Sequence, residues 1–299
     1  MDLQYVRRES PDPSRRRLYL RAILIAIAGN ALLAAVKGVV AWSSGSSAIL
    51  SDAANSFSDT LYSLMMAGGL YLAQRPADLS HPQGHGRFEP LVSLLIVGAM
   101  GLAGFAALRE SALRFRSGAV VIASGWPTAV LVGSVGVKIG MYVLVRRIGR
   151  LVHSPAIGAS ARDNLADVLV SAAAIVGVWG SHLVHPLFDP VAGAVVSLWI
   201  FRTAWEILVE NLGYLTGRSA PQELQTRVVA AALAVPGVLD VHQVIADYVG
   251  PQIRVDMHIH VDSEMTLRQA HAIADQVQAQ VEALPGVDLS FVHVEPADV

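Results

Sequence analysis

AILSDAANSFSDTLYSLMMAGGLYL (48–72) is an apolar run that carries an amide and a carboxylate near its middle. Asn55 and Asp59 stand four residues apart, so on a helix they share one face. The run is long enough to cross a bilayer, which takes about 20 apolar residues. An ionisable side chain in such a run is costly and usually faces a bundle interior on an ion pathway. The stretch therefore predicts a membrane helix with a polar site.

The composition of the whole chain agrees with a membrane protein. Of its 299 residues 53% are hydrophobic and 15% are charged, whereas an average soluble domain has about 25% charged residues. Apolar runs of spanning length recur, and we expect six transmembrane helices in an α-helical membrane domain. Their expected ranges are 18–42, 48–72, 91–113, 128–145, 159–183 and 191–209.

The arginines set the expected orientation. The amino-terminal segment 1–17 and the loops 73–90 and 146–155 alternate onto one side, and all carry arginine. Short loops rich in Lys and Arg stay in the cytoplasm, so we expect both termini there and a multi-pass protein of the cell's inner (plasma) membrane. The net charge of −2 gives no indication of a nucleic-acid partner.

The sequence changes character after Gly213. The last 86 or so residues are too polar to span a bilayer, and alternating strands lie between amphipathic helices in the order α-β-β-α-β. The expected division is therefore a cytoplasmic segment 1–17, a six-helix transmembrane domain 18–212 and a cytoplasmic α+β domain 213–299.

A second polar pair lies in the fifth predicted span, where Asp163 and Asp167 are again four residues apart. If the second and fifth helices touch, Asn55, Asp59, Asp163 and Asp167 converge as a four-ligand site. Three carboxylates repel one another strongly in a low dielectric, and either a divalent cation or protons remove that penalty. The chain has no cysteine, so oxygen and imidazole must hold any metal.

Two further groups of residues have the chemistry of metal ligands. Asp78, His81 and His85 lie on the loop after the second span, where they suit a zinc-type site. The tail contains five of the ten histidines. They are His242, His258, His260, His271 and His293, and Glu295 shares a strand face with His293. Singly each is typical of a surface histidine, and together they indicate a metal site.

These residues resemble the cation diffusion facilitator family along nearly the whole chain. The resemblance rests on GSSAILSDAANSFSD (45–59), RPADLSHPQGHGRFE (75–89) and DNLAD (163–167), with QAHAIADQV (269–277) and FVHVEP (291–296) in the tail. It implies proton-coupled efflux of divalent transition metals by a homodimer with a metallochaperone-like, ferredoxin-like cytoplasmic domain, and no enzymatic activity.

The resemblance also assigns the sites. The transport site corresponds to Asn55, Asp59, Asp163 and Asp167, and the loop zinc site to Asp78, His81 and His85. The cytoplasmic site corresponds to His242, His258, His271, His293 and Glu295, whereas His260 has no clear counterpart.

The transport site lacks the histidine that zinc-selective members usually carry. Asn-x-x-x-Asp followed by Asp-Asn-x-x-Asp looks like the manganese-exporting branch, and an all-oxygen site also suits Mn²⁺ better than Zn²⁺. The loop and tail histidines favour Zn²⁺ at those sites, so an exporter of Zn²⁺, Fe²⁺, Co²⁺ or Cd²⁺ is the alternative.

Two other classes of protein remain open from the residues alone. One is a membrane metal sensor that signals through its tail. The other is an intramembrane aspartyl hydrolase, although its Gly-x-Gly-Asp pattern is absent.

Overall fold

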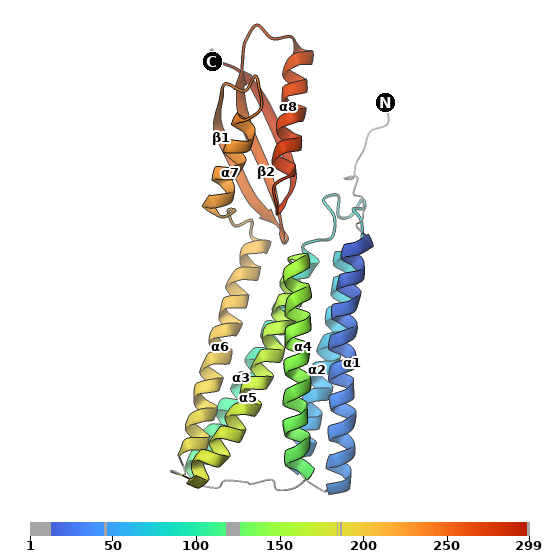
Figure 1. Cartoon of the computed structure of the whole chain (residues 1–299), viewed down its shortest axis with the longest axis vertical. Helices are drawn as coiled ribbons and strands as arrows, with labels where there is room; N and C mark the ends of the chain where they lie inside the picture. Colours follow the sequence, from blue (N-terminus) through green and yellow to red (C-terminus); the bar gives the residue numbers. More distant parts are fainter. Residues whose placement is uncertain (1–12, 45–46, 118–125, 184, 186, 298–299) are drawn as a thin grey trace. The chain divides into compact units, whose positions relative to one another are not determined.

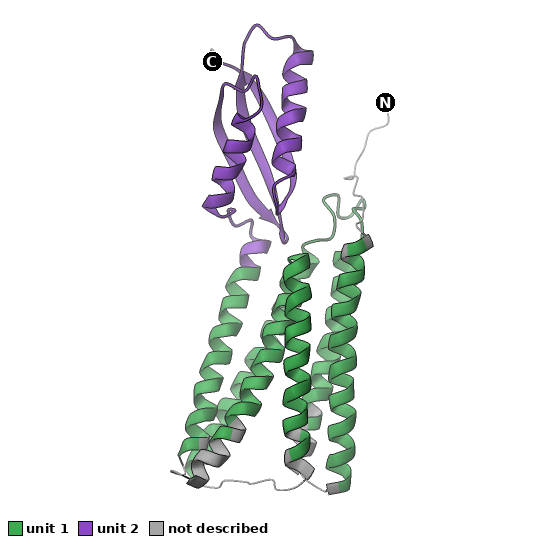
Figure 2. Ribbon diagram, viewed as in Figure 1, with its two compact units in different colours: residues 1–211 green, residues 212–299 purple. Residues whose placement is uncertain are grey.

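The computed structural model describes residues 13–44, 47–117, 126–183, 185 and 187–297. Most of the predicted amino-terminal segment 1–17 lies outside these residues. The described residues divide between two compact units, 1–211 and 212–299, which are described separately (Figure 2).

Unit 1 is a bundle of long helices (Figure 1). Its helices are α1 (Pro13–Ser44), α2 (Ser47–Ala73), α3 (Phe88–Ser117), α4 (Trp126–Val152), α5 (Pro155–Leu183) and α6 (Phe188–Leu215), which continues into unit 2. Each predicted span falls inside one of these helices, which extend beyond it at one or both ends. An apolar run predicts only the apolar part of a helix, whereas the helix itself continues through the polar turns that flank the run.

In the core of unit 1, α4 packs against both α1 and α5. Helix α2 packs against α1, and α3 packs against α2 and α5. Ile200, Ala204 and Ile207 of α6 belong to the same buried cluster as residues of α1 to α5. At the contact of α3 with α6, a Cβ on Gly104 would lie 3.2 Å from Ile200 Cγ2. The small residue therefore allows these two helices to approach closely.

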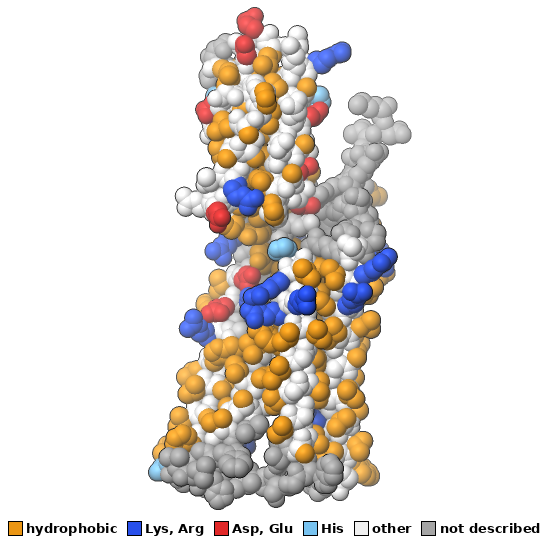
Figure 3. Space-filling view, in the orientation of Figure 1, with side chains coloured by type: hydrophobic (Ala, Val, Ile, Leu, Met, Phe, Trp, Pro, Cys, Tyr) orange, Lys and Arg blue, Asp and Glu red, His pale blue; other side chains and the backbone are white. Residues whose placement is uncertain are grey.

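The outer surface of the bundle is apolar. Leu24, Leu102 and Trp205 are each more than 60% exposed, and Figure 3 shows hydrophobic side chains over the visible face of the long helices. So large an apolar surface is not stable in water and indicates contact with lipid.

Three described helices are long and apolar enough to cross a membrane: 16–43 in α1, 88–116 in α3 and 190–215 in α6. The other long helices, α2, α4 and α5, contain the charged side chains of the polar site described below.

A buried carboxylate ties one end of the bundle together. Glu89, in the first turn of α3, is 3% exposed and accepts a hydrogen bond from the Tyr19 hydroxyl of α1 at 3.1 Å. It also accepts one from the Ser154 hydroxyl. Ser154 in turn accepts from the backbone N–H of Ile157, in the first turn of α5. These contacts join α1, α3 and α5.

Unit 2 is an α/β domain whose elements follow the predicted order. They are α7 (Gln222–Leu233), β1 (Asp240–Val249), β2 (Gln252–Val261), α8 (Leu267–Glu282) and β3 (Val287–Pro296). The sheet order is β1-β2-β3, in which β2 pairs antiparallel with β1 and parallel with β3.

The alternation along β2 decides which face of the sheet carries the histidines. Val255, Met257 and Ile259 are buried in the core that Val228 of α7 and Val277 of α8 also enter. Successive side chains of a strand point to opposite faces, so His258 and His260 lie on the face away from both helices.

Replacing Ile259 with alanine is expected to destabilise unit 2. Its side chain is fully buried, and truncating a buried isoleucine costs about 2–5 kcal/mol. Leu267→Ala is the matched control, because Leu267 is 86% exposed. Thermal unfolding of the full chain, followed by circular dichroism, measures both. Equal effects of the two substitutions would contradict the core described here.

Candidate metal centres

The first candidate centre lies between α2 and α5. Asp59 of α2 and Asp163 and Asp167 of α5 each offer a carboxylate oxygen, and these atoms all lie within 4.8 Å of one another. The four-residue spacing puts Asp163 and Asp167 on one face of α5, and tertiary packing brings them to Asp59. The structure thus brings together three of the four residues predicted for this site.

The fourth residue, Asn55, lies one turn before Asp59 on α2, and its side chain is exposed. Its neighbour Ser56 is buried and accepts a hydrogen bond from Lys37 of α1 at 3.0 Å. One turn after Asp59, Ser63 donates to the Asp59 carbonyl at 2.8 Å and accepts from Asn30 of α1 at 3.1 Å. Polar contacts to α1 therefore position α2 on both sides of Asp59.

Lys138 of α4 is a functional candidate that the sequence reasoning missed. Its Nζ lies 2.8 Å from Asp59 Oδ2 and 2.6 Å from Asp167 Oδ2, and its side chain is only 6% exposed. One ammonium thus bridges the two helices that carry the carboxylates. The available signal was a lysine in the middle of the fourth predicted span, where an ionisable residue is itself indicative of a functional site.

The chemistry of this centre is that of a cation site. Carboxylates in an apolar bundle need nearby positive charge, which a dication, protons or an ammonium can supply. All four predicted ligands are oxygen donors, which hard and borderline dications prefer.

The second candidate centre is the loop between α2 and α3. Asp78 Oδ1 lies 3.6 Å from His81 Nδ1, and Asp78 Oδ2 lies 3.5 Å from His85 Nε2. His85 Nδ1 lies 3.1 Å from the Pro76 carbonyl oxygen. Because a carbonyl can only accept, this contact keeps the proton on Nδ1 and leaves Nε2 of His85 available to a metal. The structure brings all three predicted loop residues together.

The Asp78 carboxylate is held in its ionised form. The backbone N–H of His81 donates to its Oδ1 at 2.8 Å and that of Ser80 at 2.9 Å. The His81 hydrogen bond is the main cause that lowers the pKa of Asp78 below its ordinary value. A carboxylate fixed in this way is ready to bind a cation at neutral pH.

The third candidate centre is on the sheet face of unit 2 that the helices do not cover. Glu295 of β3 lies at its middle: its Oε1 is 2.9 Å from His258 Nδ1 and 3.4 Å from His293 Nε2. Its Oε2 is 3.3 Å from His242 Nε2 and 3.7 Å from His260 Nε2. The three strands thus place four imidazoles around one carboxylate.

The His258 hydrogen bond and the histidine charges lower the pKa of Glu295. Burial by itself raises the pKa of Glu295, but the bond from His258 and the charges of His242, His258 and His293 outweigh it and lower the pKa below its ordinary value. The carboxylate therefore stays ionised at neutral pH as a metal ligand requires.

The structure places one predicted ligand, His271, apart from this cluster. Within one chain it is not part of this cluster but lies on α8, 74% exposed, with Nε2 3.7 Å from Asp275 Oδ2. The physical reason is that α8 packs on the opposite face of the sheet, through Ile273, Val277 and Val281. His260 is in the cluster instead, where its ring stacks on His242 at 4.4 Å.

Replacing Glu295 with glutamine is expected to weaken metal binding at this face by at least about 10- to 100-fold, because loss of a group that only supports a metal site already costs that much and Glu295 is a candidate ligand. Titration of the full chain with Zn²⁺, followed by calorimetry, measures the change. Glu282→Gln is the control, since Glu282 lies at the end of α8 and accepts from the backbone N–H of Ser290. Unchanged Zn²⁺ affinity in Glu295→Gln would contradict the assignment.

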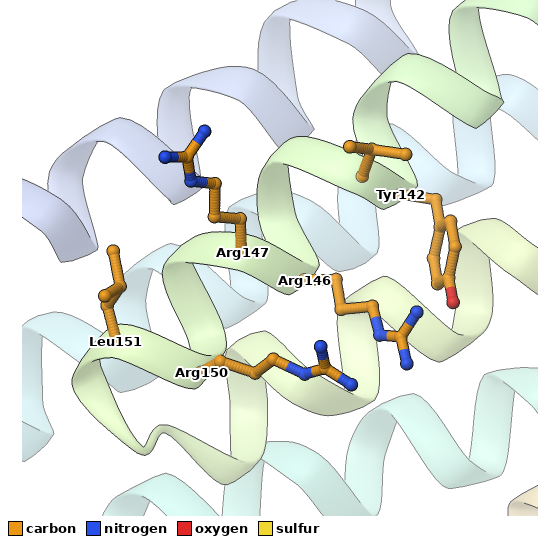
Figure 4. Close-up of a pocket in the computed structure, with 6 residues that line it drawn as sticks. Tyr142, Arg146, Arg147, Arg150 and Leu151 are labelled. Carbon is orange, nitrogen blue, oxygen red and sulfur yellow. The ribbon is translucent and has the colours of Figure 1, made fainter.

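A pocket of about 370 Å³ lies along the last turns of α4 and has a different character (Figure 4). Arg146 and Arg150 extend to the same side of the helix, and the Arg146 guanidinium lies 5.4 Å from the Tyr142 ring centroid. The third arginine that lines it is Arg147. Three cationic side chains repel a metal ion, so this pocket is not a metal site.

A lipid-facing helix bundle that carries a carboxylate cluster, joined to an α/β unit with a histidine cluster, defines a membrane transporter of metal cations. The sequence matches the family model of the cation efflux transmembrane domain over residues 23–216. It matches that of the cation efflux protein cytoplasmic domain over residues 220–297. The chain therefore belongs to the cation efflux family, which confirms the resemblance seen in its motifs.

Curated relatives match over most of their length. An uncharacterized transporter of Methanocaldococcus jannaschii is 31% identical over 93% of this chain and 98% of its own. The magnetosome protein MamM of Paramagnetospirillum magneticum is 32% identical over 86% and 81%. The manganese efflux system protein MneS of Bacillus subtilis is 27% identical over 92% and 94%. The chain is a transporter and not an enzyme, so the aspartyl hydrolase interpretation was wrong.

Proposed function

We propose that this chain is a proton-coupled antiporter that exports divalent transition-metal cations, with Mn²⁺ favoured, from the cytoplasm. The observation that carries the proposal is the cluster of Asp59, Asp163 and Asp167, whose oxygens lie within 4.8 Å of one another in a lipid-facing bundle. Asn55 completes the site as a neutral carbonyl ligand. It keeps the formal charge of the ligand set at −3, where a fourth carboxylate would make it −4.

Exchange with protons follows from the charge of the cluster. A dication offsets the repulsion between the carboxylates, and protons offset it equally when the metal leaves. The site that faces the cytoplasm loads the metal, the bundle rocks to open the other side, and protons there displace the metal. Asp59, Asp163 and Asp167 bind the metal and carry the protons.

The preference for Mn²⁺ is supported by the donor atoms. Carboxylate and carbonyl oxygens suit Mn²⁺, whereas imidazole suits Zn²⁺, and no histidine belongs to the predicted quartet. MneS, a relative named for manganese efflux, is similar to this chain over nearly its whole length.

The remaining features of the proposal concern the assembly and its membrane. We place six spans in the inner (plasma) membrane, with the segment 1–17 and the domain 213–299 in the cytoplasm, on the basis of the arginine-rich loops. The chain acts as a homodimer. The loop and cytoplasmic sites bind Zn²⁺-type ions through their histidines.

A metal-competition assay tests this function. Purified full-length chain is reconstituted into liposomes with an imposed pH gradient, and Mn²⁺ uptake is followed against equal Zn²⁺, Fe²⁺, Co²⁺ or Cd²⁺. We expect Mn²⁺ uptake that requires the pH gradient. We also expect that equal concentrations of the competing ions reduce this uptake only weakly. Uptake independent of the gradient contradicts the antiport.

Export of Zn²⁺, Fe²⁺, Co²⁺ or Cd²⁺ is the second candidate function. The observation that favours it is the histidine content of the loop and cytoplasmic centres, which suits these ions better than Mn²⁺. Stronger uptake of one of these ions than of Mn²⁺ in the same assay would support it.

A further inference from the structure

We propose that Lys138 is a tethered competitor of the transported dication: its ammonium occupies the carboxylate oxygens in the empty carrier and opposes metal binding there. This inference rests on the proposed function, because it concerns the same cluster of Asp59, Asp163 and Asp167.

The first step of the argument is that the ammonium and a metal need the same atoms. Nζ of Lys138 lies 2.8 Å from Asp59 Oδ2 and 2.6 Å from Asp167 Oδ2. A transition metal binds carboxylate oxygens at about 2.0–2.2 Å. A dication on these oxygens would therefore lie within a few ångströms of the ammonium, where like charges repel strongly in a poorly solvated site. Each cation therefore excludes the other from the carboxylates or weakens its binding there.

The second step concerns the charge of the empty carrier. Three ionised carboxylates carry a formal charge of −3, and the ammonium that contacts two of them reduces the negative charge that attracts a dication to −2. After metal release the ammonium remains in reach, because it is tethered to α4. It can then hold α2 and α5 together while the carrier returns without a metal ion.

The third step is that the buried Lys138 ammonium has little alternative to the carboxylate cluster as its partner. Its side chain is 6% exposed, and a buried ammonium is stable only beside negative groups. The cluster is where Lys138 finds them, from two different helices. It is therefore held where it acts on every cation that enters.

The test is Lys138→Met in the full chain, reconstituted into liposomes. Methionine keeps an unbranched side chain that is one atom shorter and removes the charge. We expect the KM for Mn²⁺ at fixed pH to fall by about tenfold or more, since a like charge beside the cation is lost. We expect the maximal rate to fall as well, because the metal leaves more slowly. Lys138→Arg retains a charge and should keep KM near that of the parent chain.

Arg202→Met is the control. It removes one positive charge from an exposed position on α6, where Arg202 pairs with Glu206 one turn away. A general effect of bundle charge would change KM equally in both variants. We expect a much smaller change in Arg202→Met.

An unchanged or higher KM in Lys138→Met would overturn the proposal. Lys138→Gln, which can still hydrogen-bond to both carboxylates, is measured in parallel, and its KM should fall too. If neither the Met nor the Gln variant yields folded protein while Arg does, the ion pair is structural and the proposal is also wrong. Failure of the parent chain to transport Mn²⁺ refutes the proposed function, whereas parent transport with unaltered KM refutes only the role of Lys138.

Discussion

Asp167→Ala is expected to abolish metal transport while the chain still folds into the membrane. The substitution removes one of the three clustered carboxylates and one of two partners of Lys138. Lys138 retains Asp59 at 2.8 Å, so no buried ammonium is left unpaired. Loss of a direct ligand should exceed the 10- to 100-fold effect of a supporting group, and we expect Mn²⁺ uptake to fall by more than about 100-fold.

Glu206→Ala provides the control for Asp167→Ala. It removes the same charge from an exposed position on α6, where Glu206 pairs with Arg202 one turn away. An exposed pair of this kind contributes little, so transport should remain near that of the parent chain. Proteoliposome uptake of Mn²⁺, with size-exclusion elution as the check on folding, measures both variants. Full transport by Asp167→Ala would refute the site.

Asn55→His is expected to shift preference from Mn²⁺ toward Zn²⁺. Imidazole is a softer ligand than an amide carbonyl and raises the affinity of a mixed site for Zn²⁺. Asn55 lies one turn from Asp59 and has an exposed side chain, so α2 has room for the larger ring. We expect Zn²⁺ to compete at least about tenfold better against Mn²⁺ uptake, a free-energy difference of about 1.4 kcal/mol.

Asn55→Ala separates loss of the amide from gain of the imidazole. Without either group, transport of both ions should weaken while their order is retained. The readout is the concentration of Zn²⁺ that halves Mn²⁺ uptake in the parent and in the two variants. If that concentration is the same in the parent chain and Asn55→His, Asn55 does not select the cation.

Hydrophobic periodicity predicted the helices and strands well because it reports which side chains are buried. The apolar runs located the long helices, and alternation along 252–261 located β2 together with the face that carries His258 and His260. The four-residue spacing placed Asp163 and Asp167 on one face, because that relation is local to a helix.

What could not be predicted depends on packing between elements. Nothing local to α4 indicates that Lys138 reaches Asp59 and Asp167, which are 79 and 29 residues away in the chain. Likewise, the sequence places His271 on a helix without stating which face of the sheet that helix covers. The core contacts of α8 decide this, and they separate His271 from Glu295.

The most direct test of the central claim is to locate bound Mn²⁺ in the full chain. Crystals grown with saturating Mn²⁺ give an anomalous signal at the manganese absorption edge. The account predicts a peak coordinated by oxygens of Asp59, Asp163 and Asp167, which disappears in Asp167→Ala. Peaks confined to the loop and cytoplasmic centres at saturating Mn²⁺ would contradict it.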